Sequence, residues 1–131
     1  MKDVFELTYR YVIPSIRGLL ARELIRKGIL ESEAAEVLGL SRSAISRYLK
    51  AERGSAIRVA QFKDVLQLIE ELAEDITYNK LGEYEVQEEI NKIASYFMSK
   101  KYFCKFHSKI EPKIDTTRCR ICPTVFSSKK Y

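Results

Sequence analysis

The sequence predicts an all-α fold in three parts. Apolar residues recur every three or four positions through most of the 131-residue chain, which is the period of helices with one buried face. Residues 32–49 have the spacing of a helix-turn-helix, and all three cysteines and the single histidine lie after residue 100. We therefore expect a helix-turn-helix bundle over 1–58, a helical arm over 59–100, and a small C-terminal module over 101–131 that is stapled by a metal.

Composition narrows the class of protein. Hydrophobic residues make up 46% and charged residues 31%, as in ordinary globular domains. No apolar run approaches the roughly 18 residues of a membrane helix. The N-terminus has acidic residues and no small-residue cleavage site. We therefore expect a cytoplasmic protein with no membrane partner and with reduced cysteines.

Charge is divided unevenly along the chain. Residues 1–60 carry eleven basic and seven acidic side chains. Residues 61–100 carry four basic and nine acidic ones, and residues 101–131 carry eight basic and two acidic ones. The isoelectric point is near 9.1. Two basic ends suit an anionic partner, of which nucleic acid is the commonest.

Two helices are expected before the turn of the first part. Pro14 opens the first of them, because a proline at the first helical position loses no hydrogen bond, and Gly28 supplies its left-handed cap. Its apolar face contains Ile16, Leu20 and Leu24. The second helix is expected to run from Ser32 as N-cap to Leu38, where Gly39 ends it.

The pattern SEAAEVLGLSRSAISRYL, residues 32–49, is the most specific in the chain. The small residue Ala35 stands where a second helix would cross the first, Gly39 tolerates the positive φ of the turn, and Ile45 follows six positions later. Ser41 can cap the next helix. The spacing indicates a helix-turn-helix, and the alternative is an ordinary buried helical hairpin.

The polar face of that next helix is suited to the major groove of DNA. Its exposed side chains are expected to be Arg42, Ser43, Ser46 and Arg47. Arginine makes paired hydrogen bonds to guanine, and serine donates or accepts at bases and phosphates. Lys50 and Arg53 at its far end, together with Arg17, are expected to contact the phosphate backbone. Double-stranded DNA is therefore the expected partner.

Residues 12–54 also contain the motif LGLSRSAISRYL followed by an Arg-Gly pair. In this they resemble archaeal helix-turn-helix regulators of the phage-repressor-like (XRE) type, which typically open with a Leu-Pro-x-Ile/Val-Arg helix and often carry a helical arm and a cysteine-rich tail. The resemblance implies a DNA-binding transcription regulator. The chain departs from the family at residues 30–31, where Leu-Glu replaces the common Ser-Gln. The glutamine usually touches a phosphate and a glutamate repels one, so Arg17, Arg22 or Arg26 would take over this contact.

The second part is predicted to contain two helices with apolar seams. From 61 to 77 the apolar positions are spaced by three or four residues, as in the a/d seam of a coiled coil. These positions are Phe62, Val65, Ile69, Leu72 and Ile76. After a break at Gly82, a further helix presents Val86, Ile90, Ile93 and Phe97. The two helices pack on each other within one chain or form a seam between two chains, so a homodimer is one expected assembly.

The third part holds a pattern of metal ligands. Cys104, His107, Cys119 and Cys122 are arranged as C-x2-H-x11-C-x2-C. Each two-residue gap lets a turn direct two side chains at one point, and two such turns make the closed tetrahedral site of structural zinc. Nearby basic residues are expected to favour thiolate over thiol, namely Lys105, Lys109, Lys113, Arg118 and Arg120. The same ligands would also hold an iron–sulfur cluster, and the remaining alternative is three buried cysteines and a surface histidine.

Three functions follow from these patterns. The first is a dimeric, sequence-specific DNA-binding transcription regulator with a structural zinc. The second is a regulator that senses redox state or metal through an iron–sulfur cluster, and the third is an interaction module whose basic tail binds RNA or protein. An enzyme is not expected, because a closed four-ligand site has no open position and no nucleophile–base pair or phosphate-binding glycine loop is visible. No small-molecule substrate is identified.

Overall fold

The computed structural model describes residues 1–127 and is all-helical, which confirms the all-α class. Residues 128–131, the end of the predicted C-terminal module, lie outside the described residues. Over residues 1–127 no strand is formed, and none of the helices is long and apolar enough to cross a membrane.

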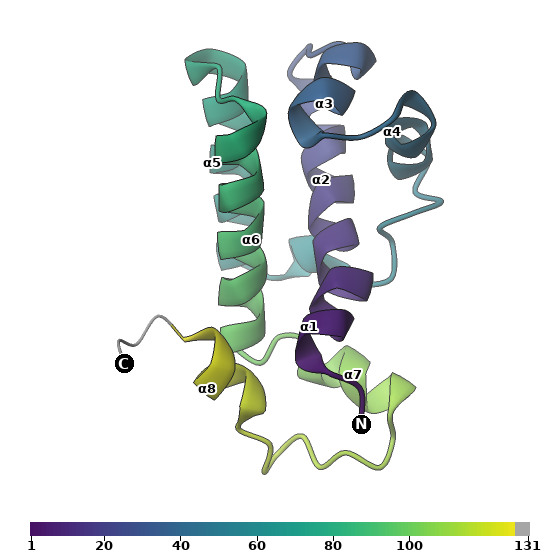
Figure 1. The fold of residues 1–131 in the computed structure, drawn as a ribbon, viewed down its shortest axis with the longest axis vertical. Coiled ribbons are helices and arrows are strands. Elements are labelled where there is room, and N and C mark those ends of the chain that lie inside the picture. Colours follow the sequence, from purple (N-terminus) through teal and green to yellow (C-terminus); the bar gives the residue numbers. More distant parts are fainter. Residues whose placement is uncertain (128–131) are drawn as a thin grey trace.

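Long helices form the body of the molecule, and short ones lie toward its two ends (Figure 1). In chain order the elements are α1 (Val4–Leu7), η1 (Thr8–Val12), α2 (Ile13–Arg26), α3 (Glu31–Leu38), α4 (Arg42–Leu49), η2 (Val59–Gln61), α5 (Lys63–Asn79), α6 (Glu83–Ser99), α7 (Cys104–Ile110) and α8 (Ile121–Phe126). Helices α5 and α6 form a hairpin beside α2, with α3 and α4 toward one end and α7 and α8 at the other.

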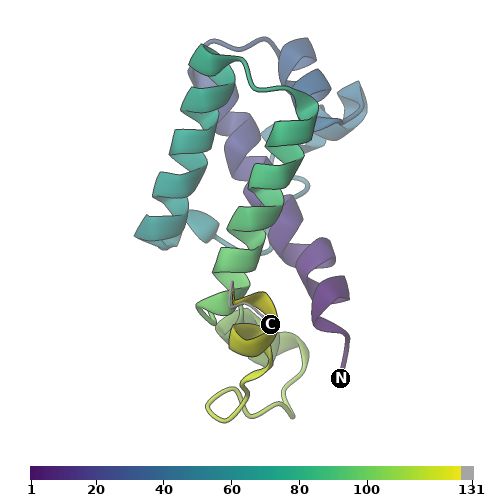
Figure 2. The same ribbon diagram turned by 60° about the vertical axis from the view of Figure 1, so that its left-hand side comes forward.

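One hydrophobic core joins the three parts that the sequence predicts. Helix α2 lies at its centre and contacts α3, α4, α5 and α6, and its residues Ile16, Leu20 and Leu24 are fully buried. The same core extends from Val4 in α1 to Cys122 in α8. The helices of the predicted arm are thus packed along α2, as Figure 2 shows for α5 and α6 beside the N-terminal helix.

The prediction that Pro14 opens the first helix was wrong. Helical backbone begins at Val4, where the Asp3 carboxylate accepts a hydrogen bond of 2.9 Å from the Phe5 N–H and caps the helix. It continues without a break through the π turn η1 into α2, so Pro14 lies inside a long helix. π-Helix is rare and occurs mostly as single turns inside α-helices, and here the turn changes the hydrogen-bonding register just before the residue that lacks an N–H.

The turn between α3 and α4 forms largely as predicted. Gly39 ends α3 in the left-handed conformation, with φ of 67°. Ser41 caps α4, and its Oγ accepts a hydrogen bond of 3.1 Å from the Ala44 N–H. Ser32 was wrongly predicted as the cap of α3, because the extended Leu30 takes that position and the helix starts one residue before the serine.

The apolar seam of α5 is filled within one chain. Val65 and Ile69 are fully inaccessible to solvent, and Leu72 and Ile76 are also buried. They pack where α5 meets α2 and α6. Of the two alternatives for this seam, the structure therefore favours packing within the chain, and these side chains are not free to join two copies.

A polar cluster ties the start of the C-terminal segment to the α5–α6 hairpin. The carboxylate of Asp64 accepts hydrogen bonds from the hydroxyls of Tyr96, at 2.5 Å, and Tyr102, at 2.8 Å. The ring of Tyr102 also stacks on Phe62 with centroids 4.3 Å apart. The hydrogen bond to Asp64, burial and the carboxylate charge raise the pKa of Tyr96 to about 12. The cluster fixes where the segment that carries the cysteines begins.

Two glycines with positive φ offer a matched test of the packing between α2 and the loop after α4. At Gly54 (φ 76°) an added Cβ would collide with the carbonyl oxygen of Pro14, whereas at Gly28 (φ 95°) nothing lies within 4 Å. Gly28→Ala should therefore cost only the left-handed strain of about 1–2 kcal/mol. Gly54→Ala should cost a further 1–3 kcal/mol or so from overpacking. Urea unfolding measures both, and equal losses would contradict the close contact.

Candidate functional site

Helix α4 has one buried face and one exposed polar face. Ala44, Ile45 and Tyr48 are buried against the rest of the protein. The predicted reading residues Arg42, Ser43 and Arg47 are exposed, as is Lys50 after the helix, while Ser46 is half-buried. The exposed face therefore contains the side chains that the sequence assigns to DNA, with Ser46 at its edge.

The basic groups of this face have no carboxylate partner in the part of the chain that the structure describes. Among residues 1–127, Arg42, Arg47, Lys50 and Arg53 form no ion pair with a carboxylate. The guanidinium of Arg47 lies 3.5 Å from the Ser43 hydroxyl, one turn away on the same face. These charges are thus available to an anion from outside the chain.

The three arginines suggested for phosphate contact have different surroundings. Arg22 donates a hydrogen bond of 3.1 Å to the carbonyl of Tyr48, which anchors the end of α4 on α2. Arg26 is paired at 2.5 Å with Glu23, whose side chain is only 9% exposed. Arg17 has no such partner in the described part of the chain, so it is the one that remains available.

The four predicted metal ligands line one small cavity. Cys104 and His107 lie one turn apart on α7, Cys122 lies on α8, and Cys119 lies in the loop between them. Together with Lys101 and other residues they surround a cavity of about 10 Å³. Within residues 1–127 no three His, Cys, Asp or Glu side chains already form a metal-binding arrangement. The donors therefore share a cavity without converging to ligand distances.

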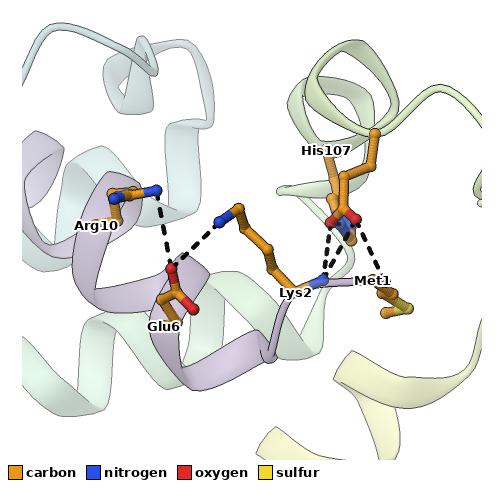
Figure 3. Close-up of polar contacts among 6 residues, drawn as sticks. Met1, Lys2, Glu6, Arg10 and His107 are labelled. Atoms are coloured by element: carbon orange, nitrogen blue, oxygen red, sulfur yellow. Dashed lines mark hydrogen bonds and ion pairs between the residues drawn. The ribbon is translucent and has the colours of Figure 1, made fainter.

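The histidine of this set is held by a carboxylate that the sequence did not point to. His107 is buried, and its Nε2 lies 2.9 Å from Oε1 of Glu111. The same carboxylate accepts a hydrogen bond from the backbone N–H of Lys2 and lies 3.8 Å from the N-terminal amine of Met1 (Figure 3). Because Nε2 is engaged, Nδ1 is the ring nitrogen left for a metal. The i, i+4 spacing of His107 and Glu111 would have indicated this contact had a helix been expected here.

The expectation that basic neighbours favour thiolate concerns the metal-bound site and stays a prediction, and in this structure the pKa values of two of the thiols are raised. Burial, followed by the Cys104 and Cys119 thiols, raises the pKa of Cys122 to about 11. Burial also raises the pKa of Cys104, opposed by Lys101. The five predicted basic residues are exposed, where water screens them, and the cation near the thiols is Lys101. Its ammonium donates hydrogen bonds of 2.6 and 2.8 Å to the Thr116 and Cys119 carbonyls.

Comparison with protein-family models, curated proteins and solved structures found no match for this chain. The resemblance to XRE-type regulators therefore rests on the sequence motifs alone. The function has to be inferred from the two sites themselves, the exposed face of α4 and the cysteine–histidine cavity.

The thiol environment predicts an order of chemical reactivity. In metal-free protein at pH 8, iodoacetamide should modify Cys122 slowest of the three cysteines, because only the thiolate attacks and this thiol is both buried and raised in pKa. Its rate should rise about tenfold per pH unit up to its pKa. Mass spectrometry of timed samples measures this, with urea-unfolded protein as the control in which the three rates converge. Preferential modification of Cys122 at pH 8 would contradict the assignment.

Proposed function

We propose that the protein is a sequence-specific DNA-binding transcription regulator in which α3 and α4 form a helix-turn-helix and α4 reads the major groove. The observation that carries this proposal is the exposed face of α4, whose arginines form no ion pair among residues 1–127 while its opposite face is fixed in the core. Leaving several cations unpaired on one rigid helix is favourable when an anionic surface supplies their partners. The XRE-like motif agrees with this interpretation.

The residues of the face have distinct proposed roles. Arg42, Ser43, Ser46 and Arg47 would contact base edges, because they lie in and after the first turn of α4, the part that enters the groove in helix-turn-helix proteins. Lys50, Arg53 and Arg17 would contact phosphates. Such contacts position the protein without reading sequence.

The proposal includes a homodimer, since paired reading helices spaced by one DNA turn of about 34 Å recognise a two-part site. The α5 seam is already covered by α2 and α6. Contact between copies would therefore use another surface. For the same reason Ile69→Asp would disrupt the core of each chain and would not report on dimer formation.

We further propose that the cysteine–histidine cavity binds one zinc ion in a structural role. Three thiols and an imidazole are the donors that zinc prefers, and all four line the same cavity. Cys104, His107, Cys119 and Cys122 would hold the ion, and Glu111 would orient the His107 ring. Bound zinc would supply folding free energy to the segment by joining α7, the following loop and α8.

The DNA proposal is tested with a duplex selected from a random library by the protein itself. Arg42→Ala or Arg47→Ala should weaken binding to the selected duplex by about 1–3 kcal/mol and to a scrambled duplex much less, because base contacts are lost. Lys92→Ala, an exposed charge on α6, is the control and should change neither affinity. Fluorescence anisotropy measures all of these. Equal losses on both duplexes would assign the arginines to phosphates, and binding of RNA in place of any duplex would favour the interaction module.

The metal proposal is tested on protein purified without oxygen. Elemental analysis should find one zinc per chain, and Cys119→Ser should lose it and become sensitive to proteases after residue 100, because the donors then no longer hold α7 to α8. Thr124→Ser, an exposed change on α8, should keep both the metal and the protease resistance. The zinc-free variant should still bind DNA if the metal is structural. If the purified protein is brown and its DNA affinity falls on oxidation, the zinc assignment is wrong and the site holds an iron–sulfur cluster that senses redox state.

A further inference from the structure

A pocket of about 260 Å³ lies beside α4, where the N-terminal helix meets the loop that follows α4. Its charged lining consists of Arg10, Arg17 and Arg53, and the rings of Tyr9, Tyr11 and Tyr48 form part of its wall. No carboxylate lines it within the described residues. The volume is below the roughly 300–1,000 Å³ typical of pockets for drug-sized ligands, so a small group fits it better than a cofactor.

The pocket concentrates positive charge, of which only the Arg10 guanidinium has a carboxylate partner among residues 1–127. Arginine is charged at any physiological pH, so three guanidinium groups face one small space. Neither Arg17 nor Arg53 forms an ion pair over residues 1–127. Arg10 lies 3.8 Å from Glu6, and both side chains are about half exposed, which makes that pair weak. An anion is the ligand that this lining would attract.

A second, independent observation at Arg17 also indicates that the pocket binds a ligand. Its Nε is buried, and it has no hydrogen-bond partner among the residues that the structure describes. A buried donor without an acceptor loses its hydrogen bonds to water and gains none in return, so proteins seldom leave one. The Nε and Nη edge of a guanidinium matches two oxygens of a phosphate, which would satisfy this donor.

Packing contacts fix the residues that form the wall of the pocket. Gly54 packs directly on the Pro14 carbonyl, which fixes the loop after α4 against the N-terminal helix. The guanidinium of Arg53 lies 6.0 Å from the centre of the Tyr48 ring, and Tyr48 itself is buried on α4. Arg53 and Arg17 are thus brought together by packing rather than by a bound group.

We propose that this pocket binds a phosphate group, and that DNA supplies it as a backbone phosphate flanking the groove occupied by α4. The placement favours DNA over a free phosphate, because Tyr48 and Arg53 belong to α4 and the loop directly after it. The choice of DNA rests on the function proposed above, whereas phosphate binding itself does not. The pocket would replace the contact that Glu31, at the start of α3, cannot make.

The DNA arm of the test measures how affinity depends on salt. Arg17→Gln and Arg53→Gln should each reduce the slope of log affinity against log salt by about 0.9, the release expected for one phosphate contact. They should weaken binding to the selected and scrambled duplexes equally. Arg118→Gln removes the same charge from the loop between α7 and α8, far from α4 in Figure 1, and should leave the slope unchanged. Unchanged slopes in both pocket variants would overturn the assignment to DNA.

The second arm asks whether the pocket binds phosphate at all. In nitrogen-15 NMR of the full chain, the Arg17 Nε–H signal should shift in a saturable way when inorganic phosphate is added, and Arg53→Gln should abolish the shift. Arg53 is exposed, so this variant should keep the wild-type melting curve. If wild-type protein binds no duplex but the phosphate shift is present, the proposed function fails and the pocket stands as a site for a free phosphate. If neither duplex nor phosphate moves the signal, the pocket proposal is wrong.

Discussion

Burial of α2 is the constraint on which the rest of the structure depends. Its residues Ile16, Leu20 and Leu24 are fully inaccessible to solvent, and four other helices pack around it. Removing one such side chain costs about 2–5 kcal/mol, a large part of the 5–15 kcal/mol that stabilises a typical domain. Because α4 rests on α2 through its buried face and through the Arg22–Tyr48 hydrogen bond, its opposite face must point to solvent. The proposed reading surface is therefore a consequence of the core.

Helical periodicity predicted most of the elements, because an apolar stripe on a helix has to be covered by something. Periodicity does not identify the covering surface, however. A second copy of the chain could have covered the α5 seam, but in the structure α2 and α6 cover it. Two boundary predictions were wrong for a related reason. Pro14 and Ser32 are good helix starters, but the Asp3 cap and the extended Leu30 set the helix starts earlier. At the N-terminus the earlier start brings Val4, Leu7 and Val12 into the buried face of the helix, whereas the structure shows no such gain at α3, where Leu30 and Glu31 are exposed.

In the candidate sites too, features set by local spacing were predictable and features set by long-range contacts were not. The face of α4 follows from local spacing, and the four predicted ligands line one cavity, while their role as metal ligands stays a prediction. Features that depend on long-range contact were not predictable. The arginine pocket brings residue 10 to residue 53 through the contact of Gly54 with Pro14. The raised pKa values of the Cys104 and Cys122 thiols have burial as their first cause, and burial cannot be read from composition.

The continuous N-terminal helix places the two sites in physical contact. Just before its first turn, the Lys2 N–H donates to the Glu111 carboxylate that contacts His107 in the cysteine–histidine segment. Two turns further on, Tyr11 lines the arginine pocket and also packs on Phe106 of α7, with ring centres 5.0 Å apart. Phe106 lies between Cys104 and His107 on α7, so any change in how that helix is held alters the packing behind a wall of the pocket. A structural zinc would therefore stabilise the pocket as well as the tail, and a metal that changed state would have a direct route to the proposed phosphate contact. Coupling of the second kind requires α7 to have two alternative arrangements, one for each state of the metal, because only an element with two arrangements can be biased by both sites.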